Sequence, residues 1–218
     1  MDHVHLTSEQ GNALVQQNDS HFLDFKSMRI SPAKATQTVS AFANADGGEL
    51  LIGIEDQKTT GDRWIGFDNE EAANAIVAVL TNLFPPGEIF SYTFITADDV
   101  HGTVLRVEAL KNRNIWRDSA GDYFARRGAQ NIRLDRDGTR ELEYSKGLTS
   151  FEDEKLDVET DYIIDSSELS SFLKNVVPSA APEKWLSKQR LVIDGKLTVA
   201  GALLFAEEPQ ALLSESRN

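Results

Sequence analysis

The pattern of apolar and polar positions predicts a strand, a helix and a second strand between residues 19 and 56. Leu23 and Phe25 share one face of a first strand, which we place at residues 21–26. Residues 49–54 contain the apolar run LLIGI, which is typical of a strand buried on both faces. Because connections of this kind form right-handed βαβ units, we expect the two strands to be parallel.

The intervening helix has clear signals at both ends. Ser31 is a suitable N-cap, and Pro32 suits the first helical position because its missing N–H is not needed there. Apolar positions recur at helical spacing and form one stripe: Ala35, Thr38, Val39, Phe42 and Ala43. Gly47 or Gly48 can adopt the left-handed conformation that ends a helix.

The following sequence predicts further elements of the same domain. A return strand is expected at residues 63–67, and a helix at 69–84 that is stopped by a Pro-Pro-Gly sequence. Strands at 90–96 and 103–110 should form a hairpin. Residues 1–18 are polar, and a weak amphipathic stretch from Ser8 to Gln16 is a candidate short helix capped by Thr7 or Ser8. His3 and His5 have no third ligand, so a frayed terminus is favoured there over a metal site.

The C-terminal third differs in composition from the rest. Residues 141–165 are charged and poor in large apolar side chains, which favours a linker or long surface loop. Helices are expected to begin at Ser166 or Ser167, at Pro182 and at Thr198. We therefore predict an α+β fold with a mixed sheet, a βαβ unit and flanking helices over residues 1–140, followed by a small helical, winged-helix-like appendage over residues 166–218.

Composition narrows the classes of function. The chain has no cysteine, which excludes disulfides and thiolate zinc sites. No run is long and apolar enough to span a membrane, so a cytoplasmic protein without a membrane partner is expected. The net charge of −13 argues against a general nucleic-acid binder. Residues 106–140 nevertheless carry nine basic and five acidic side chains, and this segment is a candidate electrostatic footprint.

Three carboxylates mark the βαβ unit, namely Asp19 before the first strand, Asp24 within it and Asp56 after the second. An aspartate inside a strand runs against propensity. Asp24 either faces solvent or is held there for chemistry, and alternation places Lys26 on its face. The structural alternative is that Asp19 and Asp56 each belong to a local turn.

The chain resembles the Schlafen AlbA-type domain family of bacterial proteins and vertebrate Schlafens. The residues that carry the resemblance are Asp19, Asp24-Phe25-Lys26, Val39 to Asn44, Gly47-Gly48 and Ile52 to Asp56. Weaker similarity continues through Gly66, Arg126 to Gly128 and Asp194 to Phe205.

The resemblance implies a nucleic-acid-binding domain that in several members is a metal-dependent endoribonuclease acting on structured RNA such as tRNA, and in some relatives serves antiviral defence. It also implies a three-carboxylate active site at Asp19, Asp24 and Asp56, in which Mg²⁺ or Mn²⁺ would suit the oxygen ligands. Lys26 is assigned a phosphate contact. Nuclease members carry Glu at the first two positions, where this chain has Asp.

Aromatic and arginine residues alternate between residues 115 and 134. In a strand, Arg126 and Arg127 point to opposite faces, and together with Arg117 they are candidates for gripping phosphates. The structural alternative is a half-buried edge strand whose arginines extend to solvent.

Two function classes follow, beside a third, a protein-interaction scaffold, which the acidic surface and the C-terminal helices would favour. The first is an endoribonuclease with RNA preferred over DNA. The alternative is a non-catalytic nucleic-acid-binding or regulatory module. The sequence does not determine the oligomeric state, and a homodimer stays among the expectations.

Overall fold

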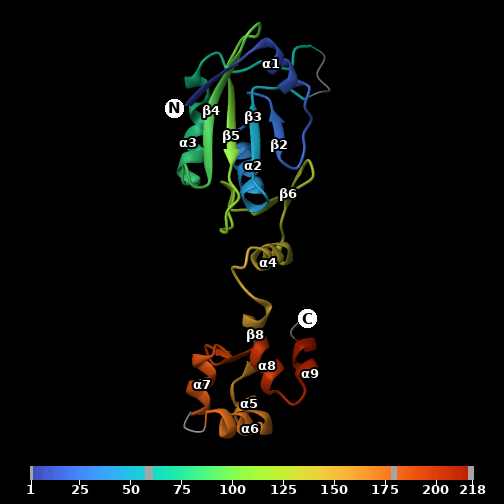
Figure 1. The fold of residues 1–218 in the computed structure, drawn as a ribbon, viewed down its shortest axis with the longest axis vertical. Coiled ribbons are helices and arrows are strands. Elements are labelled where there is room, and N and C mark those ends of the chain that lie inside the picture. Colours follow the sequence, from blue (N-terminus) through green and yellow to red (C-terminus); the bar gives the residue numbers. More distant parts are fainter. Residues whose placement is uncertain (1, 57–60, 178–180, 216–218) are drawn as a thin grey trace. The chain divides into compact units, whose positions relative to one another are not determined.

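The computed structural model describes residues 2–56, 61–177 and 181–215, which belong to two compact units, Met1–Lys146 and Gly147–Asn218 (Figure 1). The expected linker at 141–165 instead contains regular structure. It includes the end of helix α4 (Arg136–Ser145), strand β8 (Lys155–Glu159) and the short helix α5 (Asp161–Ile164). Charged residues occupy exposed positions of these elements, which is why their composition suggested a loop.

The first unit is built on a five-stranded mixed sheet with the order β1-β4-β5-β3-β2 (Figure 1). Both outer pairs, β1 with β4 and β2 with β3, are parallel, and the central pairs are antiparallel. The strands are β1 (Asp2–Leu6), β2 (Leu23–Lys26), β3 (Gly48–Ile52), β4 (Phe90–Ala97) and β5 (Val104–Ala109). The predicted βαβ unit and hairpin are thus confirmed.

Two helices pack on one face of the sheet, α2 (Pro32–Asn44) and α3 (Asn74–Leu83), the latter preceded by a short 3₁₀ turn at Glu70–Ala73. The Ser31 hydroxyl accepts a hydrogen bond from the Lys34 backbone N–H and caps α2, as predicted. Phe42 is fully buried among the side chains of this core. The opposite face carries a smaller apolar cluster around Phe25, against which α1 (Ser8–Val15) packs.

The N-terminus is ordered. The short helix expected at Ser8 to Gln16 is confirmed as α1, whereas the expectation of a frayed terminus was wrong. Strand β1 pairs with β4, and Thr7 forms a capping box with Gln10 at the start of α1. His3 and His5 contact Glu70 and Asp98. A five-residue parallel edge strand has too few apolar residues to be recognised without its partner, β4, which lies about ninety positions away in the sequence.

The Gly-Gly pair forms the turn between α2 and β3. Gly47 has a φ of 83° and Gly48 a φ of 156°. A Cβ on Gly48 would lie 2.6 Å from the Phe42 ring, and one on Gly47 would lie 2.8 Å from the Ala109 carbonyl oxygen. Close backbone approach and positive φ together therefore require glycine here.

A second hairpin, β6 (Phe124–Arg127) and β7 (Gln130–Arg133), packs against α2. Asn44, at the end of α2, fixes the chain that leads into it. Its side-chain amide donates to the carbonyls of Trp116 and Phe124 and accepts from the Trp116 N–H, all at 2.7 Å. The expected strand at 63–67 is reduced to isolated bridges at Trp64 and Phe67.

The second unit combines helices with a three-stranded sheet of order β8-β10-β9, consistent with the expected small, largely helical segment. Its other elements are α6 (Ser167–Val176), α7 (Pro182–Lys188), β9 (Val192–Ile193), β10 (Lys196–Thr198), α8 (Val199–Phe205) and α9 (Pro209–Glu215). Phe172, Trp185 and Phe205 pack against one another in its core. Ser166 caps α6 and Thr198 caps α8, as predicted. Within the described residues, no helix combines the length and apolar character needed to cross a bilayer.

We predict that Gly47→Ala lowers the free energy of unfolding more than Gly121→Ala. Both glycines have a positive φ, 83° and 87°, so each alanine carries left-handed strain of about 1–2 kcal/mol. At Gly47 the new Cβ also crowds the Ala109 carbonyl, for about 1–3 kcal/mol more, whereas at Gly121 nothing lies within 4 Å. Urea unfolding measures the difference. Equal losses would show that the turn after α2 tolerates a side chain.

Candidate nucleic-acid interface

Asp19 and Asp56 lie close together at one end of the β2–β3 pair. They line a common pocket of about 220 Å³ whose walls also include Phe25 and Arg63. The Asp19 Oδ1 accepts a hydrogen bond from the Phe25 backbone N–H at 2.9 Å. The Arg63 guanidinium lies 5.2 Å from the centre of the Phe25 ring and donates to the Glu55 carbonyl. Asp19 thus has a structural role in the start of β2, and a cationic side chain is already part of this pocket.

Asp24 points to the other face of the sheet. In register, it pairs with Leu50, which packs toward α2, while its neighbour Phe25 belongs to the opposite cluster. Asp24 is only 1% exposed. One carboxylate oxygen lies 2.8 Å from the Lys26 Nζ as an ion pair, and the other accepts a hydrogen bond from Arg126 at 3.2 Å. Asp24 is therefore neither a solvent-facing residue nor a member of the pocket shared by Asp19 and Asp56.

The three aspartates do not fit a single metal centre in this arrangement. Asp24 is buried and lies outside the pocket that Asp19 and Asp56 share, and its charge is balanced by two cationic side chains. No group of three or more His, Cys, Asp or Glu side chains suited to a metal ion occurs within the described parts of the chain. Mg²⁺ or Mn²⁺ binding stays a prediction from the sequence alone.

Arg126 is a buried structural residue. Its guanidinium is 4.9 Å from the centre of the Phe42 ring and donates hydrogen bonds to the carbonyls of Ser20 at 2.7 Å and Leu23 at 3.0 Å. It also donates to the Asn131 side chain at 2.8 Å. With 2% of its surface exposed, Arg126 cannot reach a phosphate from solvent, contrary to its predicted binding role. Its burial also differs from the structural alternative, in which the arginines of this strand extend to solvent.

Arg127, unlike Arg126, is not buried. It is exposed and lines a cavity of about 660 Å³ bounded by the end of α2, β6 and α4. Lys111, Arg113 and Lys146 line the same cavity. Within the described residues, the side chains of Arg113 and Arg127 make no hydrogen bond or ion pair. Arg117 is also exposed, but it stacks on the Tyr123 ring at 4.7 Å and does not line this cavity.

Lys146 is a member of this site that the sequence did not reveal. Its Nζ donates to the carbonyls of Ala43 at 3.1 Å and Asn112 at 2.7 Å, so it binds the C-terminal end of α2. Partial burial lowers the pKa of its ammonium group, and the nearby charge of Lys111 lowers this pKa further. A lysine at the end of a charged helix gives no sequence signal for such a position.

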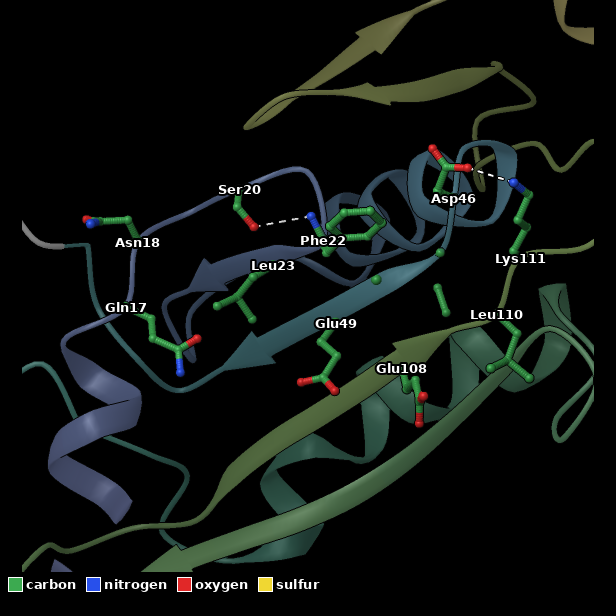
Figure 2. Close-up of a pocket in the computed structure, with 13 residues that line it drawn as sticks. Gln17, Asn18, Ser20, Phe22, Leu23, Asp46, Glu49, Glu108, Leu110 and Lys111 are labelled. Carbon is green, nitrogen blue, oxygen red and sulfur yellow. Dashed lines mark hydrogen bonds and ion pairs between the residues drawn. The ribbon is translucent and has the colours of Figure 1, made fainter. Parts of the chain in front are cut away.

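Figure 2 shows the residues that line a second cavity, of about 740 Å³. It is lined by Phe22, Glu49 and Glu108, and it shares Asp46 and Lys111 with the cationic cavity. Asp46 accepts hydrogen bonds from Lys111 at 2.7 Å and interacts with His21 at 3.0 Å, and both contacts lower the pKa of its carboxyl group. Asp46 and Lys111 therefore lie between two cavities. We call the one lined by Lys111, Arg113, Arg127 and Lys146 the cationic cavity and the one lined by Glu49 and Glu108 the acidic cavity.

A comparison with protein families agrees with the family resemblance. The family model described as Schlafen, AlbA_2 matches residues 19–135, more than half of the chain. Among solved structures, the DIP2311 protein from Corynebacterium diphtheriae is similar at 20% identity and a TM-score of 0.43. That similarity covers 91% of this chain and 44% of the other, so this chain spans under half the length of that protein. No curated protein matches.

We predict that Arg126→Ala lowers the free energy of unfolding by about 3 kcal/mol, because it leaves Asp24 buried with one oxygen uncompensated. Arg127→Ala, one residue along the same strand, is the matched control and should change stability by less than about 0.5 kcal/mol, because the side chain is exposed. Chemical denaturation measures both. Similar effects for the two variants would contradict the assigned role of Arg126.

Proposed function

This chain belongs to the Schlafen, AlbA_2 family, and from that premise we propose that its first unit is a non-catalytic module that binds RNA. Membership of the family indicates a nucleic-acid-related function. The observation that carries the proposal is the cavity lined by Lys111, Arg113, Arg127 and Lys146. These cationic side chains come from three separate segments and converge on one hollow.

Arg113 and Arg127 are the residues best suited to phosphate. Both are exposed, and neither is committed to a partner among the described residues. A guanidinium presents planar, paired donors that match phosphate oxygens. Lys111 is bound to Asp46 and Lys146 to two carbonyls, so these two supply positive charge from fixed positions.

The acidic surface of the rest of the protein determines how the affinity for RNA depends on salt. A net charge of −13 repels polyanions at long range, so affinity must come from local contacts in the cavity. Such contacts release counterions and weaken steeply with salt. The resemblance of the motif residues to the family implies RNA rather than DNA as the ligand.

The endoribonuclease alternative has one supporting observation, the common pocket of Asp19 and Asp56. It lacks the third carboxylate, because Asp24 is buried on the other face and paired with Arg126. The non-catalytic module therefore agrees better with the geometry.

We predict that a fluorescently labelled RNA hairpin binds the protein at about 50 mM salt and loses affinity steeply toward about 200 mM. The double variant Arg113→Ala with Arg127→Ala should reduce the slope of log K against log salt by about 1.4, since each contact to a single-stranded segment contributes about 0.7. Arg29→Ala is the control, because Arg29 is exposed and does not line the cavity. Fluorescence anisotropy measures RNA binding by the unmodified protein, the double variant and the Arg29→Ala control.

Absence of binding at low salt, or an equal effect of Arg29→Ala, would refute the assigned interface. A parallel incubation of the unmodified protein with tRNA and Mn²⁺ should leave the RNA intact. Cleavage that is lost in Asp19→Ala or Asp56→Ala would instead establish the endoribonuclease. Asp24→Ala is not informative here, because its loss disturbs the fold as well as any chemistry.

A further inference from the structure

We propose that the cavity shown in Figure 2 is a subsite for an unpaired nucleobase that carries an exocyclic amino group. The inference rests on the proposed function and adds the class of nucleic acid that is bound. Phe22 lies at this cavity and is 57% exposed, the most exposed aromatic side chain of the described residues. Unpaired bases stack on exposed aromatic side chains of this kind.

The Phe22 ring is held in place rather than loosely exposed. The His21 ring packs against it in a T-shaped arrangement, with the ring centroids 4.8 Å apart and an interplanar angle of 89°. His21 is in turn fixed by Asp46 at 3.0 Å, and the Phe22 backbone N–H donates to the Ser20 hydroxyl at 3.2 Å. Since a stacking platform is more effective when it is ordered beforehand, these contacts favour a binding role over an incidental exposed side chain.

Two glutamates determine what can enter beside the ring. Glu49 of β3 and Glu108 of β5 lie directly opposite each other in the antiparallel register (Figure 2). Like charges in this position destabilise a sheet. Neither carboxylate has a cationic partner among the described residues, and Glu108 only accepts a weak hydrogen bond from Ser91 at 3.4 Å. Phosphate is therefore repelled from this cavity, whereas a neutral group that donates hydrogen bonds is favoured.

Nucleobases meet this requirement when they are unpaired. The amino groups of cytosine, adenine and guanine donate hydrogen bonds, and carboxylates are recognised acceptors for such groups. Uracil has no amino group, and its N3–H donor lies between two carbonyl oxygens that the carboxylates repel. In a duplex the base faces are stacked and inaccessible to Phe22. The chemistry thus points to single-stranded or looped RNA with A, C or G at this position.

The two cavities can hold the phosphates and a base of the same RNA strand. They share Asp46 and Lys111 in their walls. A strand whose phosphates contact Arg113 and Arg127 in the cationic cavity can place a neighbouring base in the acidic one. The cationic cavity then holds the RNA backbone, and the acidic cavity on the other side of Asp46 and Lys111 holds the base.

The test measures binding of labelled single-stranded oligo(A), oligo(C) and oligo(U), and of a blunt RNA duplex, by fluorescence anisotropy. Loss of one stacked base weakens binding roughly fivefold to 150-fold. Phe22→Ala should weaken binding of oligo(A) and oligo(C) by this amount and change duplex binding by less than about twofold. Phe22→Tyr should retain affinity, because the aromatic face is kept.

Phe151→Ala is the matched control, because Phe151 is 44% exposed but belongs to the second unit. The double variant Glu49→Gln with Glu108→Gln should reduce the preference of the unmodified protein for oligo(A) and oligo(C) over oligo(U). Equal binding of all oligonucleotides, or no effect of Phe22→Ala, would overturn the base subsite. If the Arg113 and Arg127 salt dependence persists in that case, the proposed function stands and only this subsite fails.

Discussion

The contact between Arg126 and strand β2 is the constraint on which the rest of the first unit depends. One guanidinium satisfies the buried Asp24 carboxylate and the carbonyls of Ser20 and Leu23, and it stacks on Phe42. Because a buried charge is tolerated only when it is paired, this contact fixes the β6–β7 hairpin against both the sheet and α2. Arg126 and Arg127 both line the cationic cavity, and of these two only Arg127 is exposed.

The fold of the first unit also keeps a cationic cavity and an acidic cavity apart on a protein that is acidic overall. Asp46, at the end of α2, binds Lys111 and His21 and lies between the cationic cavity and the acidic one. Its position follows from the Gly47 and Gly48 turn, which brings the end of α2 against β5. The turn that completes the βαβ unit therefore also forms the boundary between the two cavities.

Local signals predicted the βαβ unit well, because Ser31, Pro32 and the glycine pair each act through neighbouring residues. Contacts between distant segments were not predictable in the same way. Strand β1 depends on β4, and Lys146 is defined only by carbonyls contributed by α2 and the loop after β5. Asp24 shows most clearly that a contact between distant residues is not predictable from local sequence. Its position in a strand was unusual, but its partner Arg126 lies more than a hundred residues away.

The most direct test of the account separates the structural role of the Asp24 and Arg126 pair from nucleic-acid binding. A double-mutant cycle with Asp24→Leu and Arg126→Met should show that the double variant is more stable than the sum of the single losses implies, because no lone charge remains buried. The folded double variant should bind an RNA hairpin with nearly unchanged affinity. Additive stability losses, or a large loss of RNA affinity in a folded double variant, would contradict the account.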